Sequence, residues 1–289
     1  MAALLYLRMK AFDPRAWLAL AAGAFSLSPR AARPWPAQAD AQEDAQAGLR
    51  QALVQEGIAL DLAGGVLSVP ATVLIKNELL EYLLVGPNGA MHESLFLTQV
   101  RPSLLNAALL LLGVEPGRNA HWEERAGPGR ESGTNEHGRP NRTIYPPQGD
   151  GFFLYAAWRE AGETYFFRVE DMVRNLESGR SLRRQRWVYL GSRFLALKSG
   201  ARESFLADVE GNLINLSFFF QGNTLLTSAA PECFEQTIWA ANEWLLPGRG
   251  QPVRFFFARE PLERLTPEML ATLPEVREEA QAQQAGADK

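Results

Sequence analysis

The sequence predicts an α+β domain: a largely antiparallel sheet built from successive hairpins, packed on one buried apolar helix, with a minor helix near the C-terminus. Short runs of apolar residues, separated by turns containing Gly, Pro and Asn, recur along most of the chain, which is typical of antiparallel strands. Residues 102–112 are rich in leucine on every side, with Ser103 and Asn106 as their only polar residues. A helix without a polar stripe belongs inside a domain.

The first 39 residues have the layout of a secretory signal peptide. Basic residues precede the apolar run 16–27, and Ala37-Gln38-Ala39 offers a small-x-small cleavage site. We therefore expect export to the periplasm or beyond, whether translation starts at Met1 or Met9; an N-terminal anchor that stays attached is the alternative. Residues 40–48 are rich in Ala and Gln and are expected to be a disordered linker.

The domain itself is expected to span residues 49–262. The tetrapeptide Gly86-Pro87-Asn88-Gly89 predicts a turn between two strands. If these strands form a hairpin, Glu81, His92 and Ser94 share one face of the sheet, because side chains alternate along a strand. Turns between 57–61 and 66–74, between 152–158 and 164–169, and between 204–209 and 212–219 predict that each of these pairs is also joined as a hairpin. The strand-like runs lie at residues 57–61, 66–74, 79–85, 91–98, 152–158, 164–169, 187–194, 204–209, 212–219 and 252–258.

Three further segments have distinct signals. Pro102 suits the first turn of a helix, and Gly113 is placed to end it; this helix is too short to span a membrane. Residues 118–149 are rich in Gly, Pro and charged residues and predict a long loop insertion. Residues 263–289 predict a C-terminal helix, with Pro267 in its first turn, followed by a polar tail.

Composition excludes several function classes. The formal net charge of −4 over 289 residues argues against a general nucleic-acid binder. A single cysteine, Cys233, excludes a disulfide within the chain and an all-cysteine cluster. The three histidines are far apart and show no ligand spacing. We therefore expect no metal and no cofactor.

The first candidate site consists of Glu81, His92 and Ser94. A carboxylate, an imidazole and a hydroxyl in line are the elements of an activated nucleophile. The alternative is a polar cross-strand cluster on a solvated face. His92 with Glu81 and Asp208 is a weaker possibility as a metal ligand set.

The second candidate site is a polar cluster that could bind a ligand. Ser192 and Arg193 follow Gly191, and Asp208 and Asn212 belong to the next predicted hairpin. Arg193 could hold a carboxylate or phosphate ligand; the alternative is an Arg193–Asp208 pair that positions two strands. The remaining ligand-binding candidate is Glu93.

An ordered set of motifs resembles the YdjY domain, a family of mostly exported bacterial proteins. The similarity covers roughly residues 50–260, and the resemblance implies an exported protein of unassigned role. The 118–149 loop is longer than the family pattern, and the stretch after Asn215 departs from it. Some family proteins are described as ferredoxin-like, but one cysteine cannot hold such a cluster. The motifs are His92-Glu93-Ser94 followed by RPSLLNAALLLLGVEPG, then Trp158, VEDMVRNLESGRSL (169–182), WVYLGSRF (187–194), FLADVEGNLINL (205–216) and GQPVRFFF (250–257).

These observations favour a non-enzymatic module that binds a partner or a small ligand at the cell envelope. The chain contains no nucleophile elbow, phosphate loop or HExxH motif. The alternatives are an envelope hydrolase centred on Glu81, His92 and Ser94, and an accessory subunit of an envelope redox complex.

Overall fold

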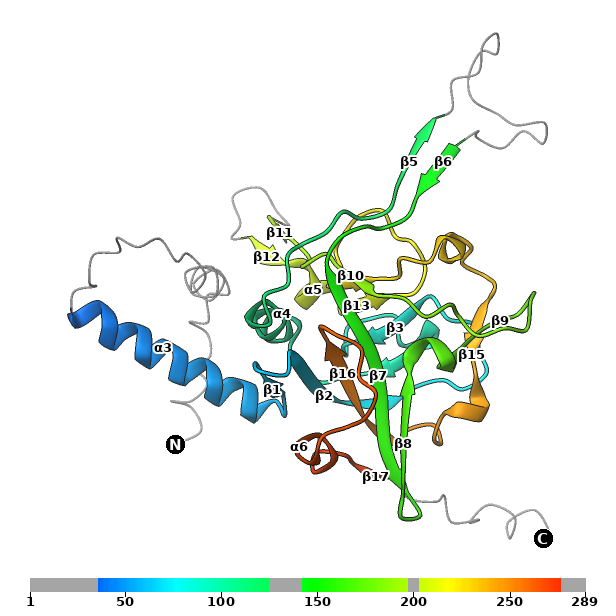
Figure 1. The fold of residues 1–289 in the computed structure, drawn as a ribbon. Coiled ribbons are helices and arrows are strands. Elements are labelled where there is room, and N and C mark those ends of the chain that lie inside the picture. The colour runs from blue at the N-terminus through cyan, green and yellow to red at the C-terminus, as the bar shows by residue number, and fades with distance from the viewer. Residues whose placement is uncertain (1–35, 125–141, 197–202, 277–289) are drawn as a thin grey trace, which may run out of the picture.

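The computed structural model describes residues 36–124, 142–196 and 203–276, and its centre is a closed barrel of eight strands (Figure 1). Pairing between β4 and β2 closes the wall. In order around the wall, the strands are β2 (Val66–Val73), β16 (Pro252–Ala258), β7 (Gly151–Glu160), β10 (Trp187–Tyr189), β14 (Leu226–Thr227), β13 (Asn212–Asn215), β3 (Tyr82–Val85) and β4 (Ser94–Leu97).

The predicted α+β class is therefore wrong: the molecule is mostly β, and its sheet closes on itself instead of lying on one helix. Closure depends on β2, which pairs with β16 along residues 66–72 and with β4 through Thr72 and Val73. Two junctions of the wall, β3–β4 and β13–β14, are parallel. A pattern of successive hairpins does not predict parallel neighbours, because these need a crossover connection.

Some predicted hairpins are present and others are not. The hairpin of β7 with β8 (Glu163–Arg168) is confirmed, as is that of β1 (Ala59–Asp61) with β2. The hairpin predicted for 79–85 and 91–98 is wrong, since β3 and β4 are parallel with Tyr82 opposite Ser94. Their connection contains the 3-10 turn η1 (Met91–Glu93).

The hairpin predicted for 204–209 and 212–219 is also wrong. Its first half is the short strand β12 (Ser204–Phe205) followed by helix α5 (Leu206–Glu210), and β12 pairs with β11 (Phe194–Leu195). Gly211, at φ 72°, ends α5 in the left-handed conformation that favours glycine. The chain then enters β13.

The leucine-rich helix is buried as predicted, although it is not the base of a sheet. Helix α4 (Pro102–Leu111) has residues 102–109 buried, and it contacts α5 and α3 (Pro36–Gln55). Leu104, Leu105, Ala108 and Leu109 belong to the same hydrophobic cluster as most apolar side chains of the barrel. The helix therefore adds its apolar side chains to the hydrophobic core of the barrel.

Strand β16 shows why the barrel wall is apolar on both sides. Phe255 and Phe257 belong to the main cluster, whereas Phe256 belongs to a second cluster with Tyr155. Met269 of helix α6 (Pro267–Leu270) joins that second cluster. Because side chains alternate along a strand, the C-terminal segment covers the face of β16 opposite to the core.

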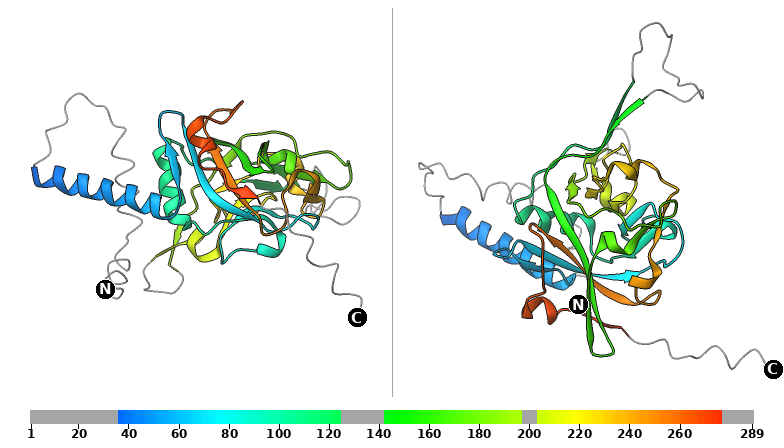
Figure 2. Two further views of the ribbon diagram at one scale, coloured as in Figure 1. Left: turned by 90° about the horizontal axis from the view of Figure 1, so that it is seen from below. Right: turned by 45° about the vertical axis from the view of Figure 1, so that its right-hand side comes forward.

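The predicted long loop contains a two-stranded ribbon, β5 (His121–Glu124) and β6 (Arg142–Tyr145), which projects away from the barrel (Figure 1, and the right-hand view of Figure 2). Residues 40–48, expected to be a linker, lie in α3, which extends from the barrel in both views of Figure 2. The remaining elements are η2 (Val169–Met172), β9 (Val173–Asn175), η3 (Pro231–Phe234), β15 (Trp239–Ala241), η4 (Glu243–Leu245) and β17 (Glu275–Val276).

Most of the predicted signal peptide, residues 1–35, lies outside the described residues. Among the helices of the described segments, none is long and apolar enough to cross a membrane.

Candidate functional site

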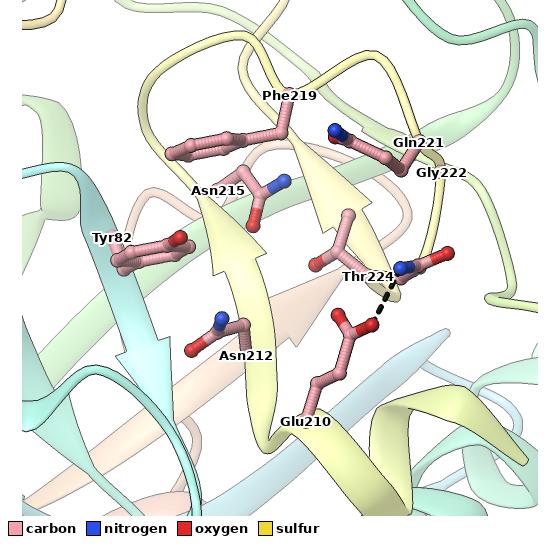
Figure 3. A pocket seen from close by; sticks show the side chains of 9 residues that line it. Tyr82, Glu210, Asn212, Asn215, Phe219, Gln221, Gly222 and Thr224 are labelled. Carbon is pink, nitrogen blue, oxygen red and sulfur yellow. Dashed lines mark hydrogen bonds between the residues drawn. The ribbon is translucent and has the colours of Figure 1, made fainter.

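A pocket of about 280 Å³ opens beside the parallel junctions of the barrel wall. Strands β3 and β13 contribute to it, together with the end of α5 and the segment that leads from β13 to β14 (Figure 3). Its lining residues are Tyr82, Glu210, Asn212, Asn215, Phe219, Gln221, Gly222, Asn223 and Thr224.

The turn between α5 and β13 places two polar side chains at the pocket. Glu210 and Asn212 flank Gly211, and a Cβ on this glycine would come within 2.5 Å of the Gly89 nitrogen. Only glycine therefore lets the 86–89 segment pack against this turn. The amide oxygen of Asn212 accepts a hydrogen bond from the Ala90 nitrogen at 3.0 Å, which holds the side chain in place.

A network of hydrogen-bonded polar side chains holds the opposite side of the pocket in place. Arg193 Nε donates to Asn223 Oδ1 at 2.8 Å, and Asn223 Nδ2 donates to Glu210 Oε1 at 2.6 Å. The Ser192 hydroxyl donates to the Asn223 carbonyl oxygen at 2.6 Å. Ser192 and Arg193 thus hold a lining residue without lining the pocket themselves.

Asn215 carries the most informative polar group of the site. Its side chain is 4% exposed, and its Oδ1 has no hydrogen-bond partner. In Figure 3 the amide lies between the rings of Tyr82 and Phe219 on one side and Gln221 and Thr224 on the other. A buried amide without a partner costs about 1–3 kcal/mol relative to a satisfied one. The pocket therefore contains an unmet requirement for a hydrogen-bond donor.

Two neighbours of Asn215 share this condition. Five buried side-chain nitrogen or oxygen atoms lack a partner in the described segments, and two of the others are Ser217 Oγ and Thr227 Oγ1. Thr227 is the register partner of Asn215 across the parallel β13–β14 junction. Three of the five unsatisfied atoms thus lie on β13, β14 or the residues directly after β13.

Two aromatic rings form an apolar flank. Tyr82 and Phe219 are stacked with ring centroids 5.0 Å apart and an interplanar angle of 2°. Burial, together with the carboxylates of Glu81, Glu93 and Glu210, raises the pKa of Tyr82 to about 12. Its hydroxyl therefore stays protonated and can donate a hydrogen bond at any physiological pH.

The first predicted cluster is adjacent to this flank, but its members differ in environment. Ser94 is fully buried, and its hydroxyl donates to the Ala90 carbonyl oxygen at 2.5 Å. The His92 side chain is 78% exposed, with Nε2 at 3.5 Å from Glu93 Oε1. Burial and the neighbouring Glu93 carboxylate raise the pKa of Glu81, and His92 opposes this shift. Because Ser94 is enclosed, the catalytic role of these residues stays a prediction without geometric support.

The second predicted cluster is divided by the structure. Asn212 lines the pocket, whereas Asp208 Oδ1 accepts a hydrogen bond from the Ser103 nitrogen at 2.7 Å, at the start of α4. Arg193 bonds Asn223, so the expected Arg193–Asp208 pair is replaced by two separate contacts. Burial raises the pKa of Asp208, although the Ser103 bonds act in the opposite direction.

Sequence reasoning missed most of the lining, namely Tyr82, Glu210, Asn215, Phe219, Gln221, Asn223 and Thr224. One signal was present: the amides of Gln221 and Asn223 flank Gly222 directly after a run of three phenylalanines. Turns with paired amides beside exposed aromatic residues are suited to ligand contacts.

No group of three or more His, Cys, Asp or Glu side chains is placed to hold a metal ion in the segments that the structure describes. Cys233 is buried, and burial raises the pKa of its thiol to about 12. Its sulfur accepts a hydrogen bond from the Ser228 hydroxyl at 3.0 Å. This cysteine is therefore an unreactive core residue.

The fold and the pocket define a closed mixed barrel with a small polar site in its wall. The chain belongs to the YdjY domain family, whose model matches residues 58–258. This match covers every strand from β2 to β16. No curated protein and no solved structure matches the chain.

Proposed function

We propose that the protein is a non-enzymatic binding module that holds a small ligand in the pocket lined by Tyr82 and Asn215. The single observation that carries this proposal is Asn215, a lining residue whose buried amide oxygen has no hydrogen-bond partner among the described residues. Natural proteins satisfy nearly all buried polar groups. We infer that the Asn215 amide turns toward the pocket when a ligand with a hydrogen-bond donor binds, and that this donor then satisfies the oxygen.

The hydrogen bonds that hold the lining residues in place are consistent with a binding role. Arg193, Ser192 and Ala90 each bond a lining residue through contacts of 2.6–3.0 Å. Side chains held in this way lose little conformational entropy when a ligand binds, so more of the interaction energy appears as affinity.

A thermal-shift screen tests the proposal. The panel contains neutral polyols, amino acids, primary amines and short carboxylic acids, each measured with the native protein and with Asn215→Leu. A ligand at a hundred times its Kd stabilises the folded state by about 2.7 kcal/mol. We expect at least one class to raise the Tm of the native protein and not that of the variant. If no compound of any class does so, the proposal is wrong.

We also propose that the protein acts at the cell envelope, on the strength of the apolar run 16–27 and the Ala37-Gln38-Ala39 motif. Cell fractionation with mass spectrometry of the N-terminus tests this. The expected result is an exported chain that begins at Asp40. Accumulation of the uncleaved chain in the cytoplasm would contradict it.

A further inference from the structure

We infer that the pocket binds a neutral, hydroxyl-rich ligand of the size of one sugar ring. This inference rests on the proposed small-ligand function and specifies the chemistry of the same site. It depends on three properties of the lining: the type of its polar groups, its apolar flank and its charge.

The polar lining consists mainly of primary amides, and part of it is already engaged. Asn223 is bonded on both sides by Arg193 and Glu210, and the oxygen of Asn212 accepts from Ala90. What remains for a ligand is the Tyr82 hydroxyl, the Asn212 amide nitrogen, the amides of Asn215 and Gln221, and the second carboxylate oxygen of Glu210. This set offers both donors and acceptors.

A hydroxyl group matches such a set, because it donates and accepts at the same time. A primary ammonium only donates, so the amide nitrogens of Asn212 and Gln221 would have no partner on it. A carboxylate only accepts, so the buried Asn215 Oδ1 would stay unsatisfied. Several hydroxyls on one rigid ring would satisfy the remaining groups together.

The apolar flank agrees with a ring-shaped ligand. The rings of Tyr82 and Phe219 stack on each other, parallel to within 2°, and the wall that they form next to the amides consists of their ring edges (Figure 3). A saturated ring with hydroxyls at its edge presents C–H groups on its faces, and these pack against aromatic surfaces. Polar groups fix the edge of the ligand while the wall contacts its body.

The charges disfavour an anion. Glu210 is the only charged side chain among the lining residues, and Glu81 and Glu93 lie close enough to Tyr82 to raise its pKa. Arg193 contacts the lining through its bond to Asn223, and it is exposed to solvent. An incoming carboxylate or phosphate would therefore approach more negative than positive charge.

The volume limits the size of the ligand. At about 280 Å³, the pocket is slightly smaller than the sites that bind drug-sized molecules, which begin at about 300 Å³. One hexose ring is a closer match than an oligosaccharide chain.

Ligand-observed NMR on the intact protein tests this inference. The probes are D-glucose, D-galactose and N-acetyl-D-glucosamine, and the comparison compounds are cyclohexanol, ethanolamine and acetate. We expect at least one sugar to bind with a Kd in the millimolar range and cyclohexanol to bind at least about tenfold more weakly, since it lacks most of the hydroxyls.

Three variants connect binding to the pocket. Asn215→Leu and Gln221→Ala should each weaken sugar binding by about tenfold, whereas Asn77→Leu, at an exposed position that does not line the pocket, should leave it unchanged. Gln221 is also exposed, so Gln221→Ala carries the test if Asn215→Leu does not fold.

The outcomes separate the two proposals. Pocket-dependent binding of ethanolamine or acetate without any sugar would overturn the hydroxyl-rich ligand and leave the small-ligand function in place. Sugar binding that is equal in the native protein and in both pocket variants would overturn the assignment of the ligand to this site. No binding by any compound would overturn both.

Discussion

Two buried polar side chains, Glu170 in η2 and Asn215 in β13, differ in how their hydrogen bonds are satisfied. Glu170, directly after β8, is fully buried and accepts hydrogen bonds from Arg168, from Trp187 Nε1 at 3.0 Å and from the Gln185 nitrogen at 3.2 Å. Asn215 is almost as deeply buried, yet its Oδ1 has no partner.

If the proposed binding function is correct, this difference separates a structural polar group from a functional one. Both oxygens of Glu170 bond the Arg168 guanidinium, at 2.6 and 3.0 Å, so this group already has what a buried charge requires. Asn215 obtains no such compensation from the described protein, and it faces a pocket. Burial alone therefore does not distinguish the two roles, whereas the state of the hydrogen bonds does.

The largest effect is expected for Glu170→Gln. The substitution leaves the Arg168 charge buried without a counter-charge, which costs about 3–5 kcal/mol and lowers the Tm by roughly 10 °C. Chemical denaturation measures the loss. Glu232→Gln is the matched control, because Glu232 pairs with Arg183, whose side chain is 64% exposed, and exposed pairs contribute less than about 1 kcal/mol. Equal losses of stability in both variants would show that the buried ion pair contributes no more than the exposed one.

Asn215→Leu should behave in the opposite way. Removing an unsatisfied buried amide should leave the unliganded protein equally stable or up to about 1 kcal/mol more stable. Asn106→Leu is the control: Asn106 Oδ1 accepts a hydrogen bond from the Tyr189 hydroxyl at 2.6 Å, so its loss should cost about 1–3 kcal/mol. Urea denaturation of both variants measures these changes in stability. Similar destabilisation would show that Asn215 has a structural role.

The pH dependence of folding stability provides a further test, at Asp208. Burial raises its pKa, so the folded state binds this proton more tightly than the unfolded state. The stabilising contribution is present below the ordinary Asp pKa of 3.8 and is lost as the pH rises through the raised value. Asp208→Asn keeps an acceptor for Ser103 but does not titrate. Its stability relative to the native protein should therefore increase between pH 3.5 and pH 7, as measured by denaturation at both values.

Asp208→Ala is the companion variant for that experiment. It removes the acceptor at the start of α4 and should cost about 1 kcal/mol. If Asn and Ala at this position give the same stability, the bond to Ser103 contributes nothing.

The smallest effect is expected for Glu81→Gln. Burial and the Glu93 carboxylate raise the pKa of Glu81, so native stability falls as the pH rises through that raised value. The variant should lose this dependence and gain only about 1–2 °C in Tm at pH 7. A thermal melt at pH 4 and at pH 7 measures it. A lower Tm at pH 7 would indicate that the charged form is stabilised instead.

The candidate site shows where sequence reasoning succeeds and where it stops. The positions of Ser192, Arg193, Asp208 and Asn212 in the sequence predict a polar cluster. Three of these residues hold or line the pocket, whereas Asp208 bonds Ser103 instead. Tyr82 and Asn215 were missed because they become neighbours only through pairing of β3 with β13. No local pattern reports a contact between segments so far apart in the chain.

Elements with local signals could be predicted from the amino-acid sequence: the buried helix α4, the β7–β8 hairpin and the apolar strand β16. Each depends on side chains or turn residues a few positions apart. Closure of the sheet, the parallel pairing of β3–β4 and β13–β14, and the pocket beside them become visible only in the folded chain. These features arise from hydrogen bonds between distant strands, and the same alternation of side chains is compatible with many pairings.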